Sequence, residues 1–227
     1  MKLNTFFAAA MLAVLMTACA GNDGRTELFN GKDLTGWELV LAPDSAVPAT
    51  EVYTVKDGNI RIAGQPFGYM RTERKYGDYT FHAEWRWVGE GANSGIKYFI
   101  GENGSVGCEF QILDDERHPD AGRGFNGNRR LGSLYDIIPA QGWQHTHKGD
   151  WNTARIVVRG KEVEHWLNGE KILSYEKGGD MWNALVSHSK FANVKNFAGG
   201  DGGHILLQDH NDLVYYRNLK IRELNKK

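Results

Sequence analysis

The sequence predicts an all-β protein in which two antiparallel sheets pack as a jelly-roll sandwich. Short segments that alternate apolar and polar residues recur along the chain, and 28 glycines are available for the tight turns between them. Only 181–192 has a pattern that could hold a helical turn or two. About a dozen short strands with one apolar and one polar face are typical of a double-sheet sandwich or jelly roll.

The first residues predict export from the cytoplasm. Lys2 supplies a positive charge, and Phe6–Met16 is an apolar stretch too short to span a bilayer as a mature helix. The small residues before Cys19 resemble a bacterial lipobox, which predicts a signal peptide over 1–18 and a lipid on the Cys19 sulfur. An ordinary cleaved signal peptide is the alternative.

A lipidated Cys19 would anchor the protein to a membrane without any spanning helix, through a polar tether over residues 19–26. The protein would then lie in the periplasm or on the outer membrane, with the cell surface as an open alternative. Because the residues after Cys19 are not strongly acidic, we expect the periplasmic side.

Residues 27–225 are predicted to form one domain, because no Pro/Ser-rich linker or charge run divides them. Asp57-Gly58, Gly160-Lys161 and Asn168-Gly169 each lie between two strand-like segments and predict hairpin turns. The predicted strands, in chain order, are 51–56, 59–63, 79–88, 95–100, 108–113, 154–159, 162–167, 171–175, 204–208 and 214–222.

Composition excludes several classes of function. The formal net charge is −1, so a nucleic-acid partner has little electrostatic support. With Cys19 as the lipid site, Cys108 is the remaining cysteine, which excludes an internal disulfide and a structural zinc site built on cysteine thiolates. We expect Cys108, Trp85 and Trp87 to be core residues, since they occupy apolar positions of alternating strands.

Two predicted strands each present polar side chains on one face. In 108–113, Glu109 and Gln111 share one face while the even positions suit the core, and 204–210 follows a similar alternation. In a curved sandwich such a face often forms a sugar-binding groove, although a plain solvated sheet face is the alternative. The polar face carries Glu109, Gln111, His204, Gln208 and His210.

The run 133–151 also holds aromatic and histidine side chains. Trp143 lies in a loop with proline and glycine, and its ring could stack on a sugar. His145 and His147 have the spacing of two metal ligands on one strand, but we expect them to line the rim of the groove or to face solvent.

The carboxylates do not form the pair that double-displacement glycosidases use. The neighbour of Glu109 on its own face is Gln111, followed by Leu113, while Asp114 has the opposite parity and begins a loop. One strand carboxylate, several histidines and Tyr135 suit proton abstraction and donation better than carboxylate attack.

Six segments resemble the 3-keto-disaccharide hydrolase family, in family order and across nearly the whole mature chain. The segments are ELFNGKDLTGWE (27–38), NSGIKYFI (93–100), CEFQILDDERHPDA (108–121), GSLYDIIPA (132–140), GDWNTARIVVRGKEVEHWLNG (149–169) and HILLQDHNDLVYYRNLKI (204–221). The family is similar in fold to concanavalin A-like lectins and glucanases and is abundant in gut Bacteroidetes. The resemblance implies cleavage of glycosides oxidised to a ketone at carbon 3, by loss of the acidified proton on carbon 2, elimination and net hydrolysis.

The same resemblance implies roles for individual residues. A histidine, His118 or His210, would be the base, and Tyr135 would donate a proton or stabilise the enolate. Glu109 and Gln111 would bind sugar hydroxyls or hold a cation, and Lys97 would polarise the ketone. The further predicted substrate-binding residues are Asp114, Gln208 and Trp143.

A divalent cation could assist enolisation, and the histidine and carboxylate inventory could hold one. However, the sequence contains no tight ligand motif of the HExxH type, so a metal site stays undefined. Two other functions remain open: an ordinary glycoside hydrolase, and a non-catalytic, lectin-like lipoprotein that binds glycans.

Overall fold

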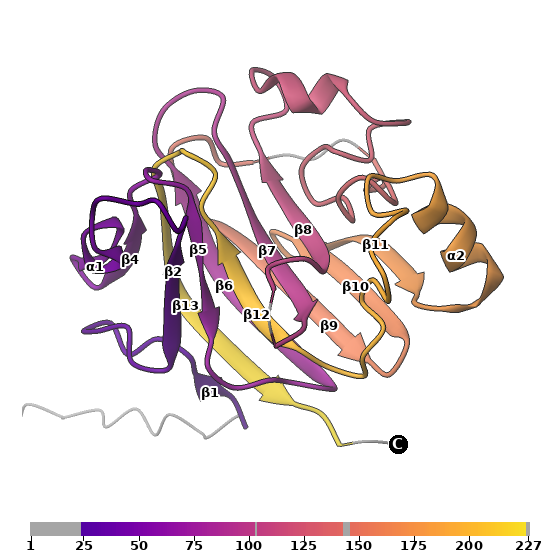
Figure 1. Cartoon of the computed structure of the whole chain (residues 1–227), viewed down its shortest axis with the longest axis horizontal. Helices are drawn as coiled ribbons and strands as arrows, with labels where there is room; N and C mark the ends of the chain where they lie inside the picture. Colours follow the sequence, from indigo (N-terminus) through magenta and orange to yellow (C-terminus); the bar gives the residue numbers. More distant parts are fainter. Residues whose placement is uncertain (1–23, 103, 143–145, 226–227) are drawn as a thin grey trace, which may run out of the picture.

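The structure, a computed structural model, describes residues 24–102, 104–142 and 146–225 and consists of two antiparallel sheets packed face to face (Figure 1). One sheet has the order β11-β10-β9-β6-β13-β4-β3, with β1 also paired to β13. The other has the order β2-β5-β12-β7-β8. The predicted all-β, two-sheet jelly-roll sandwich is confirmed.

The eight-stranded sheet contains β1 (Thr26–Glu27), β3 (Tyr53–Lys56), β4 (Asn59–Ile62), β6 (Tyr79–Trp87), β9 (Asn152–Arg159), β10 (Glu162–Leu167), β11 (Glu170–Glu176) and β13 (Val214–Glu223). The five-stranded sheet contains β2 (Trp37–Leu41), β5 (Gly68–Thr72), β7 (Asn93–Ile100), β8 (Cys108–Leu113) and β12 (His204–Gln208). The helices are α1 (Ala49–Val52), the 3-10 helix η1 (Pro119–Gly122) and α2 (Gly179–Ser187). None of the helices in these described ranges is long and apolar enough to cross a membrane.

The three predicted hairpins form. Asp57 and Gly58 join β3 to β4 with φ of 52° and 73°, and Asn168 and Gly169 join β10 to β11 with φ of 48° and 90°. Two successive positive φ angles are what a type I′ turn requires, and its twist matches that of the flanking strands. Gly160-Lys161 likewise joins β9 to β10.

The core lies between the sheets and follows the predicted alternation. In β6 every odd position from Tyr79 to Trp87 is buried, while the even positions are only half-buried. Cys108 is fully buried, as expected, and burial raises the pKa of its thiol to about 12, which keeps the thiol protonated and unreactive.

The sequence reasoning missed β1, β2 and β5 and began one strand two residues too early. In β5, Met70, Arg71 and Thr72 are all buried, so no apolar/polar alternation is visible. The predicted strand 51–56 begins at Tyr53 instead, because α1 follows directly after Pro48 and takes up residues 49–52. The predicted helical turns at 181–192 are partly confirmed by α2, which lies beside β11 (Figure 1).

The loops after β8 cover its outer face. All six residues of β8 are buried, although only alternate ones point into the core. A segment around Leu134 runs antiparallel to β8 as an isolated bridge to Phe110, and η1 lies in the same long connection. This covering segment places several predicted functional residues beside the five-stranded sheet.

Candidate active site

Three predicted site residues lie in one row across the outward face of the five-stranded sheet. Lys97 of β7 is the cross-strand partner of Glu109 of β8. The Tyr135 backbone N–H donates to the Glu109 carbonyl at 3.0 Å, and the adjacent Phe110–Leu134 bridge fixes the register. Because directly opposed residues share a face, Lys97, Glu109 and Tyr135 are neighbours on that face.

The next row along the strands holds Gln208, Gly95 and Gln111. Gly95 pairs with Gln208 on one side and with Gln111 on the other. A Cβ at position 95 would lie 2.2 Å from Glu109 Oε1 and 3.1 Å from Gln208 Oε1. The ends of both side chains therefore lie close above the backbone of the glycine. The predicted shared face of Glu109, Gln111 and Gln208 is therefore present.

A groove borders these rows on the side of β2 and β5. We define the groove by its lining residues Val40, Phe67, Tyr69, Lys97, Leu206 and Gln208. The buried Oε1 of Gln208 has no hydrogen-bond partner within the described part of the chain. A buried amide oxygen without a partner is costly, and a sugar hydroxyl would satisfy it.

The buried carboxylate beside the groove is that of Glu109. Its side chain is 3 % exposed, and Lys97 Nζ lies 3.7 Å from Glu109 Oε2. Gln111 is also buried and donates from Nε2 to Asn93 Oδ1 at 3.2 Å. The carboxylate and the ammonium thus face each other at the base of the site.

The Tyr135 hydroxyl is held by a carboxylate that sequence reasoning did not single out. It donates to Asp120 Oδ2 at 2.7 Å, and Arg129 Nη1 donates to Asp120 Oδ1 at 3.0 Å. Burial, together with the hydrogen bond to Asp120, raises the pKa of Tyr135, so the phenol stays protonated near neutral pH. Burial disfavours the Asp120 charge, but the two donated hydrogen bonds prevail and lower the pKa of Asp120.

Lys190 is a second residue that the sequence did not reveal. Its Nζ lies 4.0 Å from the centroid of the Tyr135 ring, and its backbone N–H donates to Asp136 Oδ2 at 2.6 Å. Burial of the ammonium lowers the pKa of Lys190, Glu109 partly offsets this, and Lys97 lowers it further. These mutual influences show that Lys190, Lys97 and Glu109 share one electrostatic environment. A lysine that follows a helix carries no sequence signal of such a role.

The two candidate histidines lie together, farther along the strands than the row that holds Gln208. The ring centroids of His118 and His210 are 6.4 Å apart, and His210 also packs edge-on against Phe67 at 6.1 Å. His118 Nδ1 accepts the Asp120 N–H at 3.1 Å, so in the neutral ring the proton lies on Nε2. Burial lowers the pKa of His118, and the Asp120 carboxylate partly offsets this.

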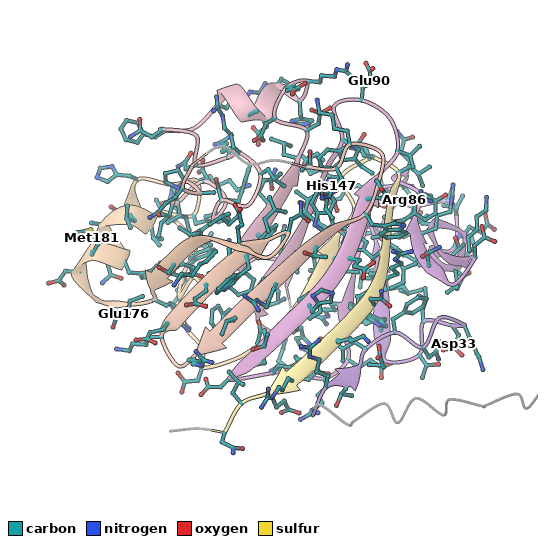
Figure 2. The ribbon with its side chains drawn as sticks, turned by 180° about the vertical axis from the view of Figure 1, so that it is seen from behind. Asp33, Arg86, Glu90, His147, Glu176 and Met181 are labelled. Atoms are coloured by element: carbon teal, nitrogen blue, oxygen red, sulfur yellow. The ribbon has the colours of Figure 1, made fainter. Side chains whose placement is uncertain are left out.

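The remaining predicted residues are placed as follows. Asp114 accepts the Gly91 N–H at 3.0 Å and the Glu116 N–H at 3.2 Å, so both of its oxygens fasten loops; its role in substrate binding stays a prediction. His147 is exposed on the surface, as expected (Figure 2). Trp143, His145 and Cys19 lie outside the described residues.

No three His, Cys, Asp or Glu side chains come together as a metal-binding group within the ranges that the structure describes. The suggested divalent cation stays a prediction. The groups that do converge are a carboxylate, two ammonium groups and a phenol, and two imidazoles lie farther along the strands. This set can bind hydroxyls, move protons and neutralise an oxyanion.

The chain is similar to known proteins over most of its length. Residues 24–222 match the model of a family described as the 3-keto-alpha-glucoside-1,2-lyase-like domain. A 3-keto-disaccharide hydrolase of Bacteroides thetaiotaomicron is 32 % identical over 235 residues, which cover 89 % of this chain and 79 % of that protein.

Solved structures support the fold. A candidate glycosyl hydrolase of Parabacteroides distasonis is 30 % identical and superposes with a TM-score of 0.77, over 89 % of this chain and 94 % of that chain. A Bacillus subtilis protein with a galectin-like fold superposes with a TM-score of 0.50 at 9 % identity, over 89 % and 96 % of the two chains, which shows the fold alone.

Proposed function

Because the chain belongs to the family of 3-keto-alpha-glucoside-1,2-lyase-like domains, we propose that it hydrolyses 3-keto-disaccharides over the outward face of the five-stranded sheet. The name and 32 % identity of the Bacteroides thetaiotaomicron relative support the substrate class. The observation that carries the proposal is the row of Lys97, Glu109 and Tyr135, which sets a carboxylate between an ammonium and a phenol.

The proposed reaction is an elimination followed by hydration. A base removes the proton from carbon 2, which the ketone at carbon 3 makes acidic, and the negative charge moves to the ketone oxygen. The enolate expels the oxygen on carbon 1, which takes up a proton. Water then adds at carbon 1 and a proton returns to carbon 2, so the net change is hydrolysis. Donors placed at the enolate oxygen lower the barrier.

We assign the base to Glu109 rather than to the histidines. The proton on carbon 2 and the ketone oxygen are close together in the sugar, so the base and the enolate-stabilising groups must be close too. Lys97 lies 3.7 Å from Glu109, and Lys190 shares its electrostatic environment, so both ammonium groups can serve the enolate. Since Glu109 is 3 % exposed, the side chains that cover it must move aside for substrate.

We assign His118 and His210 to binding the second sugar of the disaccharide, the one without the ketone. His210 lies four positions after Leu206, which lies in the Glu109 row, and four positions correspond to roughly 13 Å along a strand. The neutral His118 ring keeps an N–H on Nε2 that can donate to a sugar hydroxyl, because its Nδ1 accepts a hydrogen bond. Tyr135, held by Asp120, is placed to protonate the leaving oxygen.

The substrate class is tested with a 3-keto-disaccharide and its unoxidised parent. We expect cleavage of the 3-keto-disaccharide and not of its parent. The product formed in D2O should carry more deuterium at carbon 2 than the free 3-keto sugar gains by exchange with the solvent. Cleavage of the parent at a similar rate would instead indicate an ordinary glycoside hydrolase. Binding without turnover would indicate a lectin-like protein.

The base is tested by substitution. Glu109→Gln should lower kcat by about a hundredfold or more, with Glu170→Gln, an exposed residue of β11, as the control. His210→Gln should raise KM more than it lowers kcat, with the exposed His188→Gln as its control. If Glu109→Gln keeps its kcat while His210→Gln loses it, the base is one of the two histidines and not Glu109.

We further propose export as a lipoprotein anchored through Cys19 on the periplasmic side, on the strength of the signal sequence alone. Metabolic labelling with a radioactive fatty acid should mark the wild-type chain and leave Cys19→Ala unlabelled. A wild-type chain that is exported but unlabelled would point to an ordinary cleaved signal peptide.

A further inference from the structure

A basic groove lies on the outward face of the eight-stranded sheet, on the opposite side of the sandwich from the candidate active site. Figure 2 views the molecule from this side. Four neighbouring strands set Trp166, Arg155, His82 and Lys220 directly opposite one another in one row. Arg25 and Arg222 complete the lining that we call the basic groove.

Two arginines of this groove, Arg155 and Arg222, are available to a ligand. The Arg155 guanidinium lies 3.8 Å from the Trp166 ring centroid, and its buried Nε has no hydrogen-bond partner among the described residues. Neither Arg155 nor Arg222 forms an ion pair with a carboxylate of the described ranges. On the same face, by contrast, Arg217 pairs with Glu84 at 2.6 Å.

The charged groups around His82 indicate that the local electrostatic potential is positive. Burial lowers the pKa of His82, Glu84 partly offsets this, and Arg25, Lys220 and Arg155 lower it further. Lys220 also has a carboxylate partner, Glu27, at 2.9 Å. The cations nonetheless outnumber the acids, in a chain whose formal net charge is −1. An anion bound here would be attracted by the same charges that disfavour the protonated imidazole.

We propose that the basic groove binds the oxyanion of a phosphate or sulfate ester. A guanidinium stacked on an aromatic ring has a fixed plane, and its free N–H groups match the oxygens of such an ester. Lys220 and Arg222 supply further positive charge from β13. A sugar ester and a phospholipid headgroup present the same chemistry to the groove, so the ligand is defined by its anionic ester group.

Binding is measured by calorimetry with glucose 6-phosphate and with glucose, and by co-sedimentation with phosphatidylglycerol and with phosphatidylcholine vesicles. The informative variants are Arg155→Gln and Arg222→Gln. Arg159→Gln is the matched control, because it removes the same charge from the same strand and face but lies outside the basic groove. Melting curves verify that each variant is folded, and Arg222 is exposed, so its replacement leaves the core intact.

We expect saturable binding of an anionic ligand, weakened about tenfold or more in both groove variants and unchanged in Arg159→Gln. Binding of glucose 6-phosphate assigns the groove to a soluble ester, and binding confined to phosphatidylglycerol vesicles assigns it to a lipid headgroup. The bound anion should also raise the pKa of His82, as followed by NMR of its ring. Absence of binding to both anionic probes, or binding unchanged in both groove variants, would overturn the proposal.

Discussion

At position 95, the missing side chain decides where the carboxylate of Glu109 can lie. Gly95 stands between Gln111 and Gln208 in the sheet, and Glu109 Oε1 occupies the space that a Cβ would take. The backbone of Gly95 does not have a positive φ, so the requirement for glycine is one of space rather than of conformation. This residue contributes to the site without any functional group of its own.

Gly95→Ala should therefore displace Glu109 and lower kcat/KM by about tenfold or more while the protein still folds, because a placement error of an ångström is costly in catalysis. The measurement is steady-state kinetics with a 3-keto-disaccharide. Gly101→Ala is the control, since a Cβ there meets nothing within 4 Å. Equal activity of the two variants would show that the carboxylate does not need this position.

The sequence predicted the residues on the strand face but not those that hold them. Glu109, Gln111 and Gln208 share a face because the two-residue period of a strand can be read from the chain. Asp120 and Lys190 meet Tyr135 only through loops, whose paths have no period. Their roles could not be read from spacing.

Among the elements, the connection after β8 is fixed by one arginine. Arg129 Nη1 lies 3.0 Å from Asp120 Oδ1 in η1, and Arg129 Nε lies 2.5 Å from Asp136 Oδ1 beyond the Tyr135 segment. Both carboxylates are buried. The guanidinium therefore ties η1 to the segment that carries Tyr135 and, through Asp136, to the Lys190 backbone.

Replacing Arg129 by Gln should destabilise the protein by about 3 kcal/mol, because it leaves two buried carboxylates without their charged partner. Chemical denaturation measures the change. Arg123→Gln is the matched control: Arg123 lies 3.9 Å from the same Asp120 but is 67 % exposed, so its loss should cost about 0.5 kcal/mol or less. Similar losses of stability in both variants would show that Arg129 does not hold Asp120 and Asp136 together in the way proposed.

Strands with clear alternation, such as β6, were predicted from the sequence, whereas β5 was not. β6 exposes one face and shows the pattern plainly. β5 lies between β2 and β12, and its Arg71 is buried against Glu38 at 2.7 Å, so a charged residue stands where alternation would be sought. Both faces of β5 are buried, and its short sequence shows no clear alternation of apolar and polar residues.

For the whole molecule, a buried carboxylate makes stability depend on pH. Asp209 is fully buried; it accepts the Asn211 N–H at 3.1 Å, and its Oδ2 has no partner in the described chain. Burial raises the pKa of Asp209 from 3.8 to about 6. Between these values the folded state binds more protons than the unfolded state, so this group's contribution to stability falls as the pH rises from about 4 to 6.

Asp209→Asn removes this dependence. The free energy of unfolding of the variant minus that of the wild type should be about 2 kcal/mol larger at pH 7 than at pH 4. Denaturation at both pH values measures it. The exposed Asp201→Asn is the control and should show no such pH-dependent gain. A difference that is the same at both pH values would mean that Asp209 titrates alike in the folded and unfolded states.

The sequence by itself determined the all-β class, the three hairpins, the core face of each alternating strand and the family resemblance, because turn residues and strand periodicity act locally along the chain. Only the tertiary structure decided that Lys97, Glu109 and Tyr135 form one row, that Asp120 and Lys190 join them, and that four strands gather the basic groove. Those neighbours come from strands and loops far apart in the chain, and their register is fixed by the packing of one sheet on the other.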